Sequence, residues 1–347
     1  MRAPWTIHGL GVVAFGVLAW TGSATSAGPD DEVNTATLSH KAQKKWGINL
    51  PAEHWITVDW SIALSGGLEF PAEQTGAQKL SVDTNGDEKL DDDVKGKGGS
   101  LTLKGTTDAD EKVEYTVRLR PKGKTWEWSA GSVQQGTVEG TKVSLIDMNG
   151  NGRYDDFGQD AYLVGNSSNA AFLSRVVNLG GNLYEFTPNA LGTEVTTKPF
   201  TGETVMLDAT SEFEGKGKVV NAVFRDGDLS FNVADEAKGM KIPAGTYRFE
   251  HGYVTKGSST VTIGTGNMEP IELAPGAEHV VEWGAPIGGE FSYNQTGTKV
   301  TVNADFRFFG KLGEEYKEFT PKGGGPKIFV KDKEKGDVLT KGRFRES

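Results

Sequence analysis

The sequence of 347 residues contains no cysteine, which excludes disulfide bonds, thiolate nucleophiles, zinc–thiolate sites and an N-terminal cysteine for a lipid anchor. Basic residues are also scarce relative to acidic ones. There are 37 Lys and Arg against 47 Asp and Glu, and the formal net charge is −10. A phosphate backbone is therefore a poor partner and cations are better ones, so we expect no nucleic acid as a ligand.

The chain is rich in glycine, with 47 residues. Its hydrophobic content of 36 % is sufficient for a packed core. Short runs of alternating apolar and polar residues are separated by Gly, Asn and Asp clusters, which predicts strands and turns. The clearest such runs are residues 100–104, 113–120 and 125–128 in the first half and 205–207, 218–224, 245–249 and 259–263 in the second. Gly180-Gly181 predicts a tight hairpin turn.

These patterns predict an all-β protein of two antiparallel β domains with little helix, because many short strands favour sandwiches over a doubly wound sheet. The first domain is expected over residues 46–203 and the second over 204–347. Within the second, the step Pro243-Ala244-Gly245-Thr246-Tyr247 resembles the hairpin entry of secreted bacterial immunoglobulin-like modules. That resemblance implies an immunoglobulin-like sandwich for this domain.

The N-terminus has the layout of a secretory signal peptide. Met1-Arg2 precedes an apolar run over residues 9–20, and small residues follow up to Ala27. The run is shorter than the ~20 residues that cross a bilayer, so we expect cleavage and no membrane span in the mature chain. Residues 28–45 are expected to form a flexible leader, and the mature protein to be secreted, periplasmic or part of the cell envelope.

Two segments carry a repeated pattern of oxygen-bearing side chains. Residues 83–93 (DTNGDEKLDDD) and 147–157 (DMNGNGRYDDF) share Asp, Asn, Gly, Asp and Asp at positions one, three, four, nine and ten. Ca²⁺ takes six to eight oxygen ligands, and a coiled loop presents alternate side chains inward. Candidate ligands are the side chains of Asp83, Asn85, Asp87, Asp91, Asp147, Asn149, Asn151 and Asp155, with the backbone carbonyls of Lys89 and Arg153 at position seven.

Both segments resemble the calcium loops of the EF-hand and dockerin type, through the opening D-x-[DN]-x-[DN]. The resemblance implies a Ca²⁺ cofactor. The acidic residue of position twelve is replaced by Val94 and Gly158. The candidates for this closing ligand are Asp93 or Asp92 in the first loop and Asp156 or Asp160 in the second. Because strands precede the loops, we expect a strand–loop site. The alternative is that both are Asp/Asn/Gly turns held by local hydrogen bonds.

No pattern points to catalysis: there is no G-x-S-x-G elbow, and the histidines have no catalytic or metal-ligand spacing. We therefore expect a non-enzymatic, exported, calcium-binding protein with a structural or adhesive role, whose partner is a cell-envelope protein or a polysaccharide. A carbohydrate-binding protein is the alternative, with an aromatic platform drawn from Trp55, Trp60, Trp126, Trp128 and Tyr184. A glycoside hydrolase using a pair such as Glu314-Glu315 is a weaker one.

Overall fold

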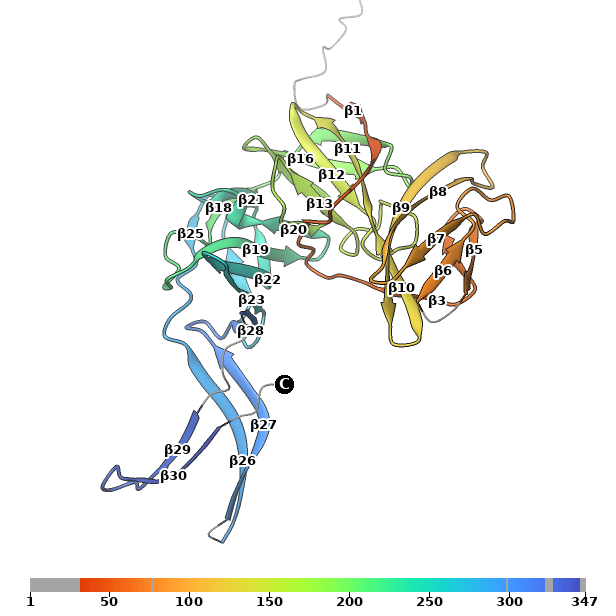
Figure 1. Ribbon diagram of the computed structural model, residues 1–347. Helices are drawn as coiled ribbons and strands as arrows, with labels where there is room; N and C mark the ends of the chain where they lie inside the picture. The colour runs from red at the N-terminus through yellow and green to blue at the C-terminus, as the bar shows by residue number, and fades with distance from the viewer. Residues whose placement is uncertain (1–31, 76–77, 298, 322–326, 344–347) are drawn as a thin grey trace, which may run out of the picture.

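The computed structural model describes residues 32–75, 78–297, 299–321 and 327–343 (Figure 1). Strands make up 58 % of the chain, and the described part contains no α-helix. The described residues contain one short 3-10 helix, η2 (Val233–Asp235). The prediction of an all-β protein built from antiparallel sheets is confirmed, consistent with a β-sandwich fold. The predicted signal peptide lies outside the described residues.

The first half of the chain forms four antiparallel sheets, of order β1-β17-β16-β15, β14-β13-β12-β11-β2, β3-β10-β9-β8 and β4-β5-β6-β7. Their strands are β1 (Asn34–Thr37), β2 (Ser39–Ala42), β3 (Ile56–Val58), β4 (Ser61–Leu64), β5 (Leu68–Gln74), β6 (Lys79–Val82), β7 (Asp92–Lys95), β8 (Gly99–Thr106), β9 (Lys112–Lys122), β10 (Thr125–Ala130), β11 (Ser132–Val138), β12 (Thr141–Ile146), β13 (Ala161–Val164), β14 (Ala171–Phe172), β15 (Val176–Leu179), β16 (Asn182–Pro188) and β17 (Glu194–Pro199). The alternating runs found in the sequence lie within β8, β9 and β10. Gly180 and Gly181 join β15 to β16 with φ of 63° and 89°, as a tight hairpin turn requires.

The second half contributes one large sheet, one small sheet and a separate hairpin, of order β20-β19-β22-β23-β28-β27-β26 with β24 on β22, β21-β18-β25, and β29-β30. Their strands are β18 (Thr204–Asp208), β19 (Lys218–Asp226), β20 (Leu229–Asn232), β21 (Met240–Pro243), β22 (Gly245–Lys256), β23 (Ser259–Gly264), β24 (Ile271–Leu273), β25 (Glu278–Val280), β26 (Gly288–Thr296), β27 (Lys299–Phe309), β28 (Glu315–Thr320), β29 (Lys327–Lys331) and β30 (Val338–Arg343). β18 and β25 run parallel, whereas the neighbouring pairs are antiparallel.

Two hydrophobic cores hold these sheets together. The first contains Trp126 and Trp128 of β10, each 2 % exposed, with Tyr115 of β9 packed edge-on against Trp128. The second centres on Phe249 and Trp283, whose rings lie 5.1 Å apart at 68°. Burial of such large aromatic side chains supplies much of the driving force for folding of each half.

The division between the two cores does not coincide with the domain boundary predicted at residue 204. Val176 and Leu183, on β15 and β16, belong to the second core, whereas Val223 of β19 belongs to the first. The hairpin β15–β16 therefore packs against the second half of the chain. An alternating strand pattern shows which residues share a face but not which neighbour that face covers.

The segment expected to be a flexible leader is structured from residue 34. β1 pairs with β17, and β2 pairs with β11. Leu38, between the two strands, is 2 % exposed and part of the first core. The expectation of a flexible leader was wrong for these residues, because their polar composition gave no sign of two edge strands. Residues 28–31 lie outside the described part.

Near the end of the described chain, β26 and β27 form a long hairpin that projects from the body, and β29 and β30 form a second, separate hairpin (Figure 1). Among the described residues, no helix is long and apolar enough to cross a membrane.

Candidate metal centre

The two repeated loops occupy equivalent places in the fold. The first connects β6 to β7, and the second connects β12 to β13. Each begins directly after a buried antiparallel strand, so the loop's first aspartate enters the protein interior. Asp83 and Asp147 are both 0 % exposed. The strand–loop arrangement expected from the sequence is therefore present in the described structure at both positions.

In the second loop, the backbone coils around the Asp147 carboxylate, which accepts hydrogen bonds from it. Its Oδ1 accepts the backbone N–H groups of Gly150 and Asn151 at 2.7 and 3.2 Å, and its Oδ2 accepts that of Gly152 at 2.6 Å. The Tyr115 hydroxyl also donates to Oδ2, at 2.9 Å. Tyr115 lies on β9, 32 residues earlier, and no local sequence pattern relates it to the loop.

The first loop repeats this coil. Asp83 Oδ1 accepts the backbone N–H groups of Asn85 and Gly86 at 3.0 and 2.8 Å, and Oδ2 accepts that of Glu88 at 2.8 Å. Asp83 and Asp147 thus each receive the N–H of the residue five positions later. Glu88 takes the place of the glycine at position six with a φ of 65°, a left-handed backbone that side chains rarely adopt.

Polar side chains of the second loop converge on one carboxylate oxygen. The side-chain amides of Asn149 and Asn151 both donate to Asp156 Oδ2, at 3.0 and 2.5 Å. In the first loop, the amide of Asn85 donates to Asp91 Oδ2 at 2.8 Å. In both loops, position three therefore faces a carboxylate from the loop's far end, at position ten in the second loop and position nine in the first. Position five does so in the second loop.

Several predicted ligands point elsewhere. Asp87 forms an ion pair with the Lys89 ammonium at 3.0 Å, and Asp155 pairs with the Arg153 guanidinium at 2.7 Å. Both pairs lie toward solvent. Lys89 and Arg153 were predicted to bind the cation through their backbone carbonyls, and these side-chain ion pairs do not involve those carbonyls. Asp93, one candidate for closing the first loop, instead accepts a hydrogen bond from Ser81 and pairs with Lys79 at 2.9 Å.

Asp160 lies beneath the second loop. It is 1 % exposed and accepts the backbone N–H groups of Met148 and Asp156 at 3.2 and 3.1 Å. Burial raises the pKa of both Asp147 and Asp160, and the charge of Asp147 raises that of Asp160 further. Burial thus disfavours the charged forms of both carboxylates, and a cation bound nearby would favour them.

The donor set is compatible with a hard cation, because carboxylate, amide and backbone oxygens are the ligands that Ca²⁺ prefers. The side chains that gather in the second loop are Asp147, Asn149, Asn151 and Asp156, with Asp160 below them. A cation there would take the Asp156 oxygen that the two amides now share. No group of three or more His, Cys, Asp or Glu side chains able to hold a metal occurs among residues 32–75, 78–297, 299–321 and 327–343. Any site must therefore draw on amide and backbone oxygens.

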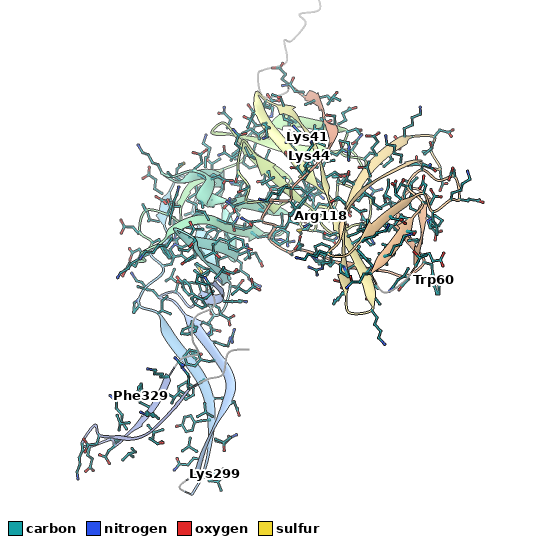
Figure 2. All side chains as sticks on the ribbon, in the orientation of Figure 1. Lys41, Lys44, Trp60, Arg118, Lys299 and Phe329 are labelled. Atoms are coloured by element: carbon teal, nitrogen blue, oxygen red, sulfur yellow. The ribbon has the colours of Figure 1, made fainter. Side chains whose placement is uncertain are left out.

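Of the residues named for the alternative functions, Trp126, Trp128 and Glu314 are buried. Trp126 and Trp128 lie in the first core and cannot stack on a sugar, whereas Trp60 is 86 % exposed (Figure 2). Glu314 is 0 % exposed, and its carboxylate accepts the backbone N–H groups of Gly284 and Leu312. Its neighbour Glu315 pairs with Arg307 at 2.7 Å. These two carboxylates therefore serve the fold.

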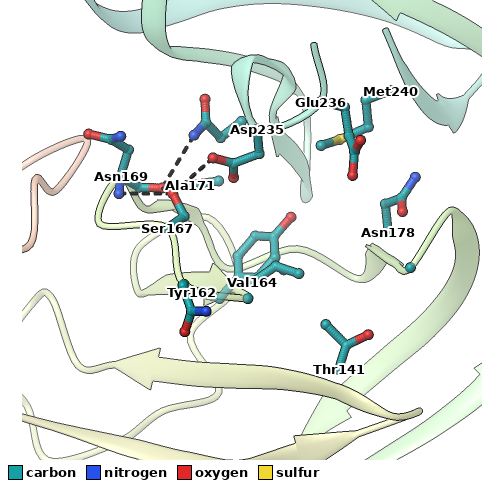
Figure 3. A pocket seen from close by; sticks show the side chains of 14 residues that line it. Thr141, Tyr162, Val164, Ser167, Asn169, Ala171, Asn178, Asp235, Glu236 and Met240 are labelled. Atoms are coloured by element: carbon teal, nitrogen blue, oxygen red, sulfur yellow. Dashed lines mark hydrogen bonds between the residues drawn. The ribbon is translucent and has the colours of Figure 1, made fainter. Parts of the chain in front are cut away.

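A cavity of about 450 Å³ lies where the two halves of the chain meet (Figure 3). Its polar lining is used for contacts between them. The amide of Asn178 donates to the backbone carbonyl of Lys241 at 2.9 Å, and Ser167 donates to the Asp235 carboxylate at 2.8 Å. This cavity therefore lies along the seam between the halves.

Comparisons with protein-family models, with curated proteins and with solved structures find no match to this chain.

Proposed function

We propose that this chain is a non-enzymatic, calcium-stabilised protein with a structural or adhesive role at the cell exterior or envelope. The observation that carries this proposal is that two loops, 64 residues apart in the sequence, coil in the same way around a fully buried aspartate. In both, the amide side chain at position three faces a carboxylate from the end of the loop. The N-terminal pattern of a signal peptide supports export.

The second loop is the stronger candidate. It combines two buried carboxylates, Asp147 and Asp160, with the inward-facing Asp156. The first loop has one buried carboxylate, and its Asp91 and Asp92 are exposed. Since neither loop has the bidentate acidic residue of position twelve, we expect dissociation constants of about 10⁻⁴–10⁻³ M, as in extracellular calcium modules.

Calcium titration followed by calorimetry and thermal melting tests the proposal. At a calcium concentration about ten times the dissociation constant, the folded state gains ~1.4 kcal/mol. We expect Asp156→Asn to reduce this gain, since it removes a carboxylate that faces the amides. Asp155→Asn is the matched control: the adjacent carboxylate pairs with Arg153 instead, so the calcium response should be unchanged. Magnesium at the same concentration controls for ionic strength.

Each variant is compared with its own calcium-free form, so a change in basal stability does not affect the comparison. A melting temperature of the unaltered protein that stays constant up to ~10 mM Ca²⁺ would refute the proposal, because that concentration exceeds the weakest expected dissociation constant. The two loops would then be hairpin turns held by their own hydrogen bonds.

A further inference from the structure

The cavity at the seam between the two halves has the size and the position of a small-molecule site (Figure 3). Its volume of about 450 Å³ lies within the range of ~300–1,000 Å³ that is typical of such sites, which often lie between domains. The described residues that line it include four asparagines and two carboxylates, and no Lys, Arg or His. Because carboxylates without a basic residue beside them repel an anion, the cavity suits a neutral or a cationic ligand.

Two of the asparagines that line the cavity are buried and held in fixed orientations. The amide of Asn178 donates to the backbone carbonyl of Lys241 and accepts the N–H of Gly181, both at 2.9 Å. The amide of Asn232 accepts the N–H of Ala222 at 2.8 Å and donates to a backbone carbonyl at 3.3 Å. An amide has two N–H groups and two oxygen lone pairs, so each side chain keeps one donor and one acceptor unused. Amides that are already oriented bind a ligand at a lower entropic cost.

Two further polar side chains that line the cavity form no hydrogen bond or ion pair within the described part of the chain. They are the carboxylate of Glu236, which follows η2, and the hydroxyl of Thr141, at the start of β12. Figure 3 shows Glu236 above the cavity and Thr141 below it. A ligand that contacts both therefore spans the seam, and it must donate to Glu236, because a carboxylate only accepts hydrogen bonds.

Apolar groups complete the lining. They are the side chains of Val164, Ala171 and Met240 and the ring of Tyr162, whose hydroxyl is occupied by its hydrogen bond to the carbonyl of Ser230. A complementary ligand therefore needs a surface of C–H groups in addition to groups that form hydrogen bonds. A sugar ring has both, since its hydroxyls surround a ring of C–H groups.

We propose that this cavity binds a neutral sugar unit of a polysaccharide. Each sugar hydroxyl both donates and accepts, as do the amides of Asn178 and Asn232 and the hydroxyl of Thr141, while Glu236 accepts from a hydroxyl. A cation would use only the oxygen atoms of this lining and would be repelled by the amide N–H groups. The inference deepens the adhesive role proposed above, and it rests on that proposal for the location outside the cell where polysaccharides occur.

Saturation-transfer NMR of the full-length protein with glucose, galactose, mannose and N-acetylglucosamine tests the proposal. We expect at least one of these sugars to bind with a dissociation constant on the order of 1–10 mM. Glu236→Ala and Thr141→Val each remove one hydrogen bond and should weaken binding about fivefold or more. Glu212→Ala and Thr137→Val are the matched controls, because they make the same changes at exposed residues that do not line the cavity, and they should leave binding unchanged.

Thermal melting without sugar shows whether each variant is folded. The proposal would be overturned if none of the four sugars bound at ~100 mM, or if the control variants weakened binding as much as the cavity variants. Binding of putrescine that Glu236→Ala weakens, without binding of any sugar, would overturn it in favour of a cationic ligand. The NMR measurement is made in a calcium chelator, because no residue of the two loops lines the cavity. Its failure is therefore distinct from the absence of a calcium response, which melting detects without sugar.

Discussion

At the scale of single residues, Asp147 has two roles that must be separated. Its carboxylate accepts three backbone N–H groups and the Tyr115 hydroxyl, so it organises the loop with or without a cation. Removing such an acceptor leaves buried donors unsatisfied, at a cost of about 1–3 kcal/mol for each affected group. A variant at this position therefore reports on folding before it reports on calcium.

We predict that Asp147→Asn lowers the free energy of unfolding by about 2–4 kcal/mol in the absence of calcium, because the new amide N–H₂ faces the Gly152 and Tyr115 donors. Urea denaturation in a chelator measures this loss. Asp155→Asn, which breaks only a partly exposed pair, should cost less than ~1 kcal/mol. Equal losses for the two variants would contradict the role assigned to Asp147.

His251 on β22 makes stability depend on pH. Burial lowers the pKa of His251 to about 4, and its Nε2 is a buried atom without a hydrogen-bond partner within the described residues. Lys317 lowers the pKa further, while Glu318 opposes this shift. The unfolded chain binds the proton near pH 6.5, so the folded state loses stability as the pH falls from about 6.5 to 4.

The expected loss over this window is up to ~3 kcal/mol. His251→Phe keeps a ring beside Tyr253 and should flatten this part of the pH profile, as measured by urea denaturation between pH 7 and 4. An unchanged slope in the variant would show that other groups cause the acid sensitivity.

At the scale of elements, the two loops have the same coil in different surroundings. Gly86 and Gly150 hold position four, with φ of 77° and 74°. A Cβ at Gly86 would meet no atom within 4 Å, whereas one at Gly150 would lie 2.6 Å from Ile56 Cδ1 and 3.2 Å from Trp128. The second loop is therefore packed on the first core, and the first loop is open on this side.

We predict that Gly86→Ala costs ~1 kcal/mol of stability, through its backbone conformation alone. Gly150→Ala should cost about 2–4 kcal/mol, because the methyl group also forces Ile56 and Trp128 to shift. Urea denaturation of both variants measures the difference. Equal costs would contradict the different packing of the two loops.

At the scale of the whole molecule, the two halves are joined by hydrogen bonds across a buried seam. The Tyr162 hydroxyl donates to the backbone carbonyl of Ser230 at 2.9 Å. The Arg225 guanidinium donates to the carbonyl of Gly158 at 3.1 Å, at the end of the second loop. The second loop therefore contacts both halves, and we expect them to unfold together.

Differential scanning calorimetry should accordingly show a single cooperative transition. Tyr162→Phe removes the donor to Ser230 and should shift the whole transition by about 1–2 kcal/mol without splitting it. Two separate transitions, of which only one responds to Tyr162→Phe, would contradict the coupling of the halves.

Much of this molecule follows from local sequence. The strands β8, β9, β10, β19, β22 and β23 lie where alternating residues predict them, because a strand with one buried face needs that period. The Gly180-Gly181 turn and the strand–loop form of both repeats follow from residues only a few positions apart. The edge strands β1 and β2 were missed, because polar residues paired at a sheet edge carry no such alternation.

The sequence by itself determined the strand content, the tight turns and the two coiled loops, since each depends on neighbouring residues and their backbone preferences. Only the tertiary structure decided that Asp156 and not Asp155 faces the second loop, that Tyr115 reaches Asp147, and that Trp126 and Trp128 are buried. Contacts between distant strands depend on how the sheets pack, which alternation along a single strand does not specify.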